Sequence, residues 1–362
     1  MPPKKGKAPP KEPLFPVYAR QDLTPGHTAL GITPLSSQGL LASALAARTA
    51  HAVSEAVREG RLDIDLAEQG LSEVPSLAAV PWLHVVNLDR NELQMAALLG
   101  RATLQAEALP ELRSLSACHN ALVGALPAAI GSLAPCLEEL ALAGNLISSP
   151  LPSSLCSLVN LEWVSLASNR IAELPGGVLA AWPRLRHLDL RSNLLQQLPP
   201  EVAQLPLLEE LHLSGNALAA LPEAWATPAL AVLSAAANAL LELPTGLAAA
   251  AALQVVDLSA NKLTVLPGEI LEGWQQLQEL YVSANALAFL PEQLGQLAGL
   301  EVLAAAGNQL AALPEGLARC TALRELYLAG NKGLSSLPEG SQQWQQLQTL
   351  SIKMCKFKTL PL

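Results

Sequence analysis

Residues 185–199 read LRHLDLRSNLLQQLP, and residues 208–222 read LEELHLSGNALAALP. Counted from the first residue of each segment, both carry Leu at offsets 0, 3, 5 and 10, Asn at offset 8 and a Leu-Pro pair at offsets 13 and 14. Self-similarity at a fixed period is typical of repeat architectures. The two segments therefore predict a stack of similar units rather than a conventional globular core.

The same frame extends in both directions along the chain. Units begin at residues 61, 83, 112, 137, 161, 185, 208, 230, 253, 277, 300, 323 and 347. Offset 8 holds Asn in eleven of these units, at Asn91, Asn120, Asn145, Asn169, Asn193, Asn216, Asn238, Asn261, Asn285, Asn308 and Asn331. Eleven matches at one offset indicate a structural role for this side chain.

Each residue type that recurs at a fixed offset has a physical role. In the LxL core, alternate residues of a short strand point to the same face, so the leucines are expected to point inward. An Asn side chain in the following turn can satisfy backbone groups of neighbouring units that would otherwise be buried without partners. Leu-Pro then turns the chain onto the convex side. Because one unit of about 23 residues buries too little apolar surface to fold alone, we expect a continuous stack from residue 61 to residue 362.

The pattern LxxLxLxxNxLxxLPxxLxxLxx resembles the intracellular, Ras-group-related class of leucine-rich-repeat proteins. The resemblance covers roughly Arg61 to Leu362, and EGRLDIDLAEQGLSEVP at residues 59–75 is similar to the first repeat of that class. It implies an α/β solenoid of about 13 repeats, with a curved parallel sheet and convex helical turns. It also implies a role in protein binding, without indicating a particular partner.

The region before the repeats predicts two further segments. Residues 1–38 contain Pro and Lys without periodicity and are interpreted as an extended tail, whereas residues 39–60 carry apolar residues at helical spacing and are predicted to form a helix that caps the stack. The opening MPPKKGK resembles the start of some axonemal proteins. This favours, as an alternative, a structural role in a large assembly such as the axoneme of a cilium or flagellum.

Composition narrows the class of partner. Lys and Arg number 22 against 31 Asp and Glu, giving a formal net charge of −9 that disfavours nucleic acid and acidic membranes as partners. The five cysteines are scattered and odd in number, which is typical of free thiols in a reducing compartment. With no apolar run of about 18 residues, the sequence predicts a cytoplasmic protein that binds other proteins and needs no cofactor.

Offsets 2, 4 and 6 should face the concave side of the sheet, where they are free of core packing. Two groups of residues stand out there. The central patch combines an aromatic residue and Arg with other ionisable side chains, a composition favoured at binding hot spots; it consists of Trp163, His187, Asp189, Arg191, Glu210 and His212. The distal patch consists of Glu279, Tyr281, Glu325 and Tyr327.

Two other interpretations are open. Ordinary solvated surface is one, for either patch, although an exposed Trp163 argues against it in the central patch. Metal or acid-base chemistry is the other, because His187 and Glu210, and likewise Asp189 and His212, should be neighbours about 4.8 Å apart. We expect hydrogen bonds and no metal, because side chains on an open strand face project in parallel. The sequence contains no GxxxxGK[ST], GxSxG or HExxH motif, so it predicts a non-enzymatic protein.

Overall fold

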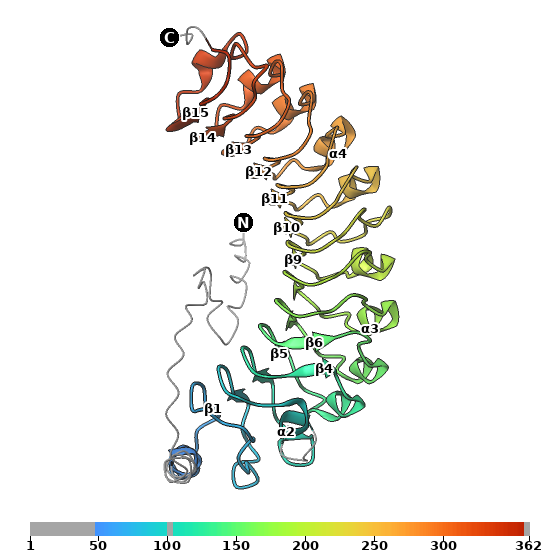
Figure 1. Ribbon diagram of the computed structural model, residues 1–362, viewed down its shortest axis with the longest axis vertical. Coiled ribbons are helices and arrows are strands. Elements are labelled where there is room, and N and C mark those ends of the chain that lie inside the picture. Colours follow the sequence, from blue (N-terminus) through green and yellow to red (C-terminus); the bar gives the residue numbers. More distant parts are fainter. Residues whose placement is uncertain (1–47, 100–103, 358–362) are drawn as a thin grey trace, which may run out of the picture.

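The computed structural model describes residues 48–99 and 104–357. Thirteen strands form one curved parallel sheet in chain order, with the strands on the concave side and the helical turns outside (Figure 1). They are β1 (Asp63–Asp65), β2 (Val85–Asn87), β3 (Ser114–Ser116), β5 (Glu139–Ala141), β7 (Trp163–Ser165), β8 (His187–Asp189), β9 (Glu210–His212), β10 (Val232–Ser234), β11 (Val255–Asp257), β12 (Glu279–Tyr281), β13 (Val302–Ala304), β14 (Glu325–Tyr327) and β15 (Thr349–Ser351). All thirteen occupy offsets 2 to 4 of the predicted units, so the predicted fold is confirmed.

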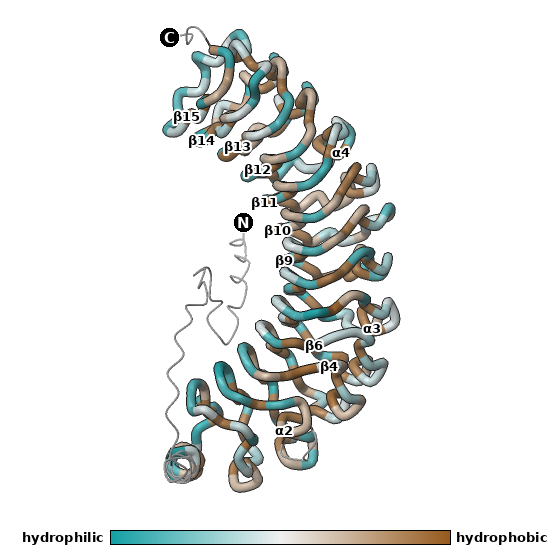
Figure 2. Tube along the Cα trace, viewed as in Figure 1, coloured by the Kyte–Doolittle hydropathy of each residue, from teal (hydrophilic) through white to brown (hydrophobic). Residues whose placement is uncertain are grey.

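The strands pair residue for residue at equal offsets. Leu188 of β8, for example, lies opposite Leu211 of β9, and both are buried. Offset 3 therefore forms a continuous apolar row beneath the sheet. Hydrophobic stretches recur from one unit to the next along the solenoid (Figure 2). A separate pair, β4 (Val123–Ala125) and β6 (Leu146–Ser148), adds a short second sheet to two adjacent units.

The Asn side chains form the predicted ladder between units. Asn261 Oδ1 accepts a hydrogen bond from the backbone N–H of Leu240 at 3.0 Å, while its Nδ2 donates to the carbonyls of Ala235 at 2.9 Å and Leu258 at 3.0 Å. In the last unit Cys355 replaces Asn, and its thiol donates to the Leu328 carbonyl at 3.2 Å. The turn thus keeps a donor at offset 8 even where the amide is missing.

The residue before each Asn position adopts a left-handed backbone conformation. All thirteen units share it, with φ between +51° and +80° at offset 7. Four of these residues are glycine, and the other nine are Glu68, Arg90, His119, Ser168, Ser192, Ala237, Ala260, Ala284 and Met354. A left-handed conformation costs a residue with a Cβ roughly 1–2 kcal/mol, which the ladder and the core must offset.

The convex side carries short helical turns, most of which follow a Leu-Pro pair; α2 (Met95–Leu99) instead follows Leu93-Gln94. The other α-helical turns are α3 (Gly176–Ala180) and α4 (Gly268–Gly273). The 3₁₀ ones are η2 (Ala128–Ser132), η3 (Ser153–Ser157), η4 (Pro200–Gln204), η5 (Thr245–Ala249), η6 (Glu292–Gln296), η7 (Glu315–Arg319) and η8 (Ser341–Gln343). Tryptophans join neighbouring turns: Trp182 Nε1 donates to the Leu155 carbonyl at 3.2 Å, and Trp274 Nε1 to the Leu247 carbonyl at 3.1 Å.

A helix at residues 48–59 covers the N-terminal end of the stack. It ends at Gly60, whose φ is +62°, and the backbone N–H of Arg61 donates to the Ala56 carbonyl at 3.1 Å, the hydrogen bond of a Schellman cap. Ala56 and Thr49 are buried against the first unit. Residues 39–47 of the predicted capping helix and the predicted tail at 1–38 lie outside the described residues. None of the described helices combines the length and the apolar character needed to cross a bilayer.

Candidate functional site

Strands β7, β8 and β9 place the central patch at the middle of the concave face. Trp163 and His187 lie opposite each other on β7 and β8, and their rings stack with centroids 5.0 Å apart and planes inclined by 11°. The His187 side chain is only 12% exposed. The indole that the sequence suggested would stand free is therefore partly covered by the neighbouring imidazole.

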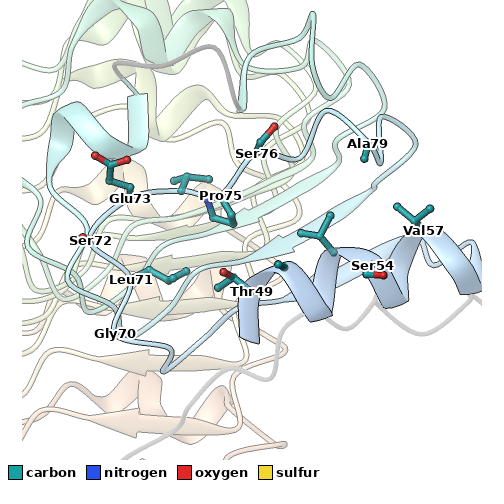
Figure 3. Close-up of a pocket in the computed structure, with 13 residues that line it drawn as sticks. Thr49, Ser54, Val57, Gly70, Leu71, Ser72, Glu73, Pro75, Ser76 and Ala79 are labelled. Carbon is teal, nitrogen blue, oxygen red and sulfur yellow. The ribbon is translucent and has the colours of Figure 1, made fainter. Parts of the chain in front are cut away.

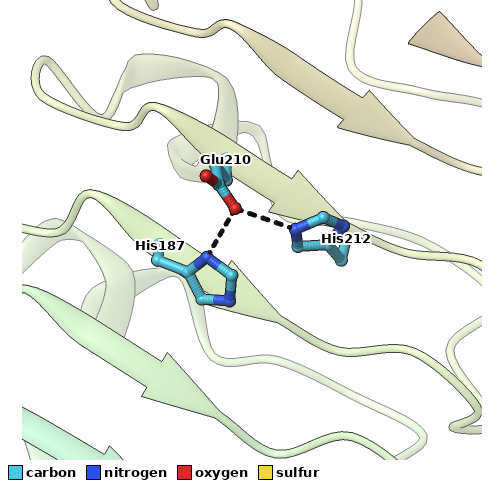
Figure 4. A group of neighbouring side chains, drawn as sticks. All are labelled: His187, Glu210 and His212. Carbon is cyan, nitrogen blue, oxygen red and sulfur yellow. Dashed lines mark hydrogen bonds and ion pairs between the residues drawn. The ribbon is translucent and has the colours of Figure 1, made fainter. Parts of the chain in front are cut away.

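Glu210 joins the two histidines of the patch. Its Oε2 lies 3.0 Å from His187 Nδ1 on the adjacent strand and 3.2 Å from His212 Nε2 two residues along its own strand (Figure 4). The two imidazoles are tilted by 48° with centroids 5.1 Å apart. The expected hydrogen bond between His187 and Glu210 is confirmed. The expectation that these side chains project in parallel is wrong, because both rings turn toward one carboxylate oxygen.

These contacts favour the ionised form of the Glu210 carboxyl. Hydrogen bonding from His187, and then from His212, holds the pKa of the Glu210 carboxyl well below its usual range, although partial burial acts in the opposite direction. The carboxylate is therefore ionised at neutral pH. His187 Nε2 is buried and has no hydrogen-bond partner among the described residues.

Asp189 and Arg191 form a second pair within the central patch. Arg191 Nε donates to Asp189 Oδ1 at 2.9 Å and its NH2 group donates to Oδ2 at 2.6 Å, a two-point contact between side chains two residues apart. Asp189 lies opposite His212 in the register, as expected, yet its hydrogen bonds go to Arg191. Asp189 is buried, whereas the Arg191 side chain is 45% exposed, so Arg191 is the member of this pair that a ligand can reach.

The distal patch separates into two pairs. Tyr281 donates its hydroxyl to Glu279 at 2.7 Å within β12, and Tyr327 donates to Glu325 at 2.7 Å within β14. Strand β13 lies between them and contributes Val302 to the concave row. Burial first, and then the Glu279 carboxylate, raise the pKa of Tyr281 above its usual value.

A row of ion pairs at offset 1 was missed in the sequence. Arg113 lies 2.8 Å from Glu138, Arg186 contacts Glu209, and Arg324 lies 3.0 Å from Glu301. Alternating charge at equal offsets of neighbouring units was the signal that could have revealed these pairs. Because these side chains remain partly exposed to solvent, each pair contributes little to stability.

Two of the thiols are held in their protonated form. Burial raises the pKa of Cys118 to about 12 and that of Cys320 to about 11, so both are protonated at neutral pH.

A groove of about 800 Å³ lies between the helix at residues 48–59 and the segment at residues 70–79 (Figure 3). Val53, Val57 and Leu71 contribute apolar lining, and Glu73 is the one ionisable side chain among the described residues that line it. With one ionisable group, the described lining of this groove offers no acid–base pair. The central patch remains the main candidate site.

Comparison with known proteins identifies the repeats directly. A leucine-rich-repeat family model matches residues 159–218 and 251–310, and a second leucine-rich-repeat model matches residues 136–158. The probable inactive serine/threonine-protein kinase roco10 of Dictyostelium discoideum is 42% identical over 86 residues, which is 23% of this chain and 3% of that protein. The chain thus spans only a small part of that relative, and the shared segment consists of repeats.

Solved structures show the same architecture over most of the chain. A leucine-rich-repeat protein of Leptospira interrogans is 26% identical with a TM-score of 0.61, covering 84% of this chain and 93% of that one. The leucine-rich-repeat ectodomain of the Arabidopsis thaliana receptor kinase GASSHO1/SCHENGEN3, solved in complex with Casparian strip integrity factor 2, is 27% identical with a TM-score of 0.63, covering 80% of this chain and 34% of that one. The protein is a leucine-rich-repeat solenoid, a fold that generally mediates protein–protein interaction and is typically non-enzymatic.

Proposed function

We propose that this protein is a non-enzymatic interaction module that binds a protein partner through the central patch on its concave face. The observation that carries the proposal is the environment of the Trp163 side chain. Its ring is held by stacking on His187, it remains partly exposed, and it makes no hydrogen bond to the described residues.

The other tryptophans have structural partners. Each of the remaining five donates its indole N–H to a backbone carbonyl, from Trp82, Trp182, Trp225, Trp274 and Trp344. Trp163 alone among the six offers an indole N–H without such a bond in the described chain. A large aromatic ring that is already ordered loses little entropy on binding, which is the property of a binding hot spot.

Charged groups surround the ring. Arg191 and Glu210 keep 45% and 46% of their side chains exposed, while their hydrogen bonds to Asp189 and the two histidines hold them in place. Such groups favour a partner with both an apolar contact for the indole and polar groups around it. The net charge of −9 favours a neutral or basic partner surface.

The receptor ectodomain with the same fold was solved with a bound protein ligand, which supports a protein as the class of partner. The cytoplasmic location, and the alternative of an axonemal assembly, remain predictions from the sequence.

Affinity capture from the cells that make this protein tests the proposal. Trp163→Ala is expected to lose at least one partner seen with wild type, by about tenfold or more in recovered amount, because an alanine at a hot spot costs about 2 kcal/mol or more. The matched control is Leu241→Ala, which removes an apolar side chain that is 60% exposed and outside the patch. Unchanged partners in the Trp163 variant, with its circular dichroism intact, would place binding elsewhere.

A further inference from the structure

The cluster of His187, Glu210 and His212 brings two imidazoles and one carboxylate together on the adjacent strands β8 and β9. Two imidazole nitrogens converge on one carboxylate oxygen, and the three ligand atoms lie within 4.8 Å of one another (Figure 4). Among the described residues this is the one group of three or more His, Cys, Asp or Glu side chains gathered so closely. We propose that it is a binding site for a zinc ion, with two imidazoles and one carboxylate as ligands.

The distances fit the coordination chemistry. Zinc lies about 2.0–2.2 Å from His nitrogen and carboxylate oxygen, so tetrahedral ligand atoms are roughly 3.3 Å apart. Two of the three separations in the cluster, from Glu210 Oε2 to His187 Nδ1 and to His212 Nε2, are 3.0 Å and 3.2 Å. The ligand atoms of all three residues lie within 4.8 Å of one another, so side-chain rotations can bring them to this spacing.

The ligands are held in place before any metal arrives. Stacking on Trp163 restricts the His187 ring, while Glu210 and His212 project from the same face of β9 because they are two residues apart. His187 and Glu210 lie opposite each other in the strand register. A site of this kind loses little conformational entropy when it binds a metal.

The donor set selects for zinc-like ions. Imidazole with a single carboxylate suits zinc and related transition metals, whereas magnesium and calcium prefer sites made of oxygen atoms. Three protein ligands leave a fourth position open for water or another molecule. This inference is independent of the proposed partner binding, because the metal is measured on the protein alone.

The test uses the full chain after removal of metal with a chelator. Zinc is titrated by calorimetry, and cobalt(II) is used as a substitute whose visible spectrum reports four-coordination. One equivalent of zinc is expected to bind saturably, with a dissociation constant in the micromolar range or below. Three variants each remove one ligand: Glu210→Gln, His212→Gln and His187→Phe, the last of which keeps a ring to stack on Trp163. Each is expected to weaken binding at least tenfold.

The matched control is Glu111→Gln, which disrupts another histidine–carboxylate pair, His84 Nε2 with Glu111 Oε2 at 3.2 Å, that lacks a third ligand. Zinc affinity should be unchanged in this variant. Circular dichroism and thermal unfolding verify that each variant is folded. The inference is overturned if wild type shows no saturable uptake up to about 100 μM zinc, or if the ligand variants bind zinc as tightly as wild type.

Discussion

The central and distal patches occupy equivalent positions on the same sheet, yet their side chains interact in different ways. In the central patch two contacts cross strands, because Trp163 of β7 stacks on His187 of β8, which bonds to Glu210 of β9. In the distal patch each tyrosine bonds to a glutamate of its own strand, and β13 separates the two pairs. Four residues of the central patch, Trp163, His187, Glu210 and His212, therefore form one connected network, whereas the distal patch consists of two separate hydrogen-bonded pairs.

This difference follows from which offsets are filled on adjacent strands. Cross-strand neighbours lie within contact distance, whereas residues two strands apart do not. In a connected network, substituting one residue changes the interactions of several others, so their effects on stability are coupled. In an isolated pair the effect stays within the pair.

The largest effect is expected from Asn261→Ala, in the unit of β11 between the two patches. Loss of this buried amide leaves the Leu240 N–H without its partner and removes one of the two amide donors of the Ala235 carbonyl, which keeps its hydrogen bond from Asn238. The free energy of unfolding should fall by about 2–3 kcal/mol, measured by urea denaturation. The exposed neighbour Lys262→Ala is the control and should change it by less than about 0.5 kcal/mol. Equal effects would contradict the ladder's role.

Double-mutant cycles address the contrast itself. His187→Phe and Glu210→Gln should show a coupling energy of about 0.5–1.5 kcal/mol in thermal or urea unfolding, because each removes one side of the same hydrogen bond. Tyr281→Phe and Tyr327→Phe should be additive to within about 0.5 kcal/mol. Coupling between the two tyrosines, or additivity in the central patch, would refute the distinction between network and pairs.

Acid unfolding tests the central patch further. The pKa of Glu210 is lower in the folded protein than its ordinary value of 4.5, so its carboxylate stabilises the fold at pH values above 4.5. That contribution is lost as pH falls through the lower, folded-state pKa. The stability difference between wild type and Glu210→Gln, followed by urea denaturation from pH 7 downward, should therefore shrink only below about pH 4.5. A difference that disappears between pH 7 and 5 would be inconsistent with this assignment.

Alkaline titration addresses the distal patch and should give the smallest effect. The pKa of Tyr281 is raised by burial and by Glu279, and that of Tyr327 by its hydrogen bond to Glu325, both from an ordinary value of 10.0. Tyrosinate absorbance of the folded protein should therefore show two of the three tyrosines ionising above pH 10. Tyr281→Phe should remove one of these late transitions, and the Tyr327→Phe variant should remove the other.

The framework was predictable from sequence because its interactions repeat in every unit. The inward Leu188, the turn residue Asn193 and the Leu198-Pro199 pair satisfy burial and backbone hydrogen bonding locally, so a fixed spacing specifies the strands. The presence of a helix before the first unit followed from apolar spacing and from Gly60. The repeated strands and this helix both depend on backbone geometry, which the spacing of residues in the sequence specifies.

For the central patch, the sequence predicted which residues belong to it but not which contacts their side chains make. The register placed His187 beside Glu210 and Asp189 beside His212. The rotamers were not specified, so it was not evident that His212 would turn along its own strand to Glu210, or that Arg191 would take both oxygens of Asp189. Side chains on an open face have several accessible rotamers, and contacts among several neighbours decide between them.

The left-handed residue at offset 7 has a consequence for engineering heat tolerance. Ala237, Ala260 and Ala284 occupy this conformation with φ between +51° and +55°. Other units place Gly144, Gly215, Gly307 and Gly330 at the same offset. Each of these alanines is thus a position where glycine would relieve backbone strain, and where the usual rule that glycine weakens a fold is reversed. A more heat-resistant solenoid can be sought there without altering the side chains of the core or of either concave patch.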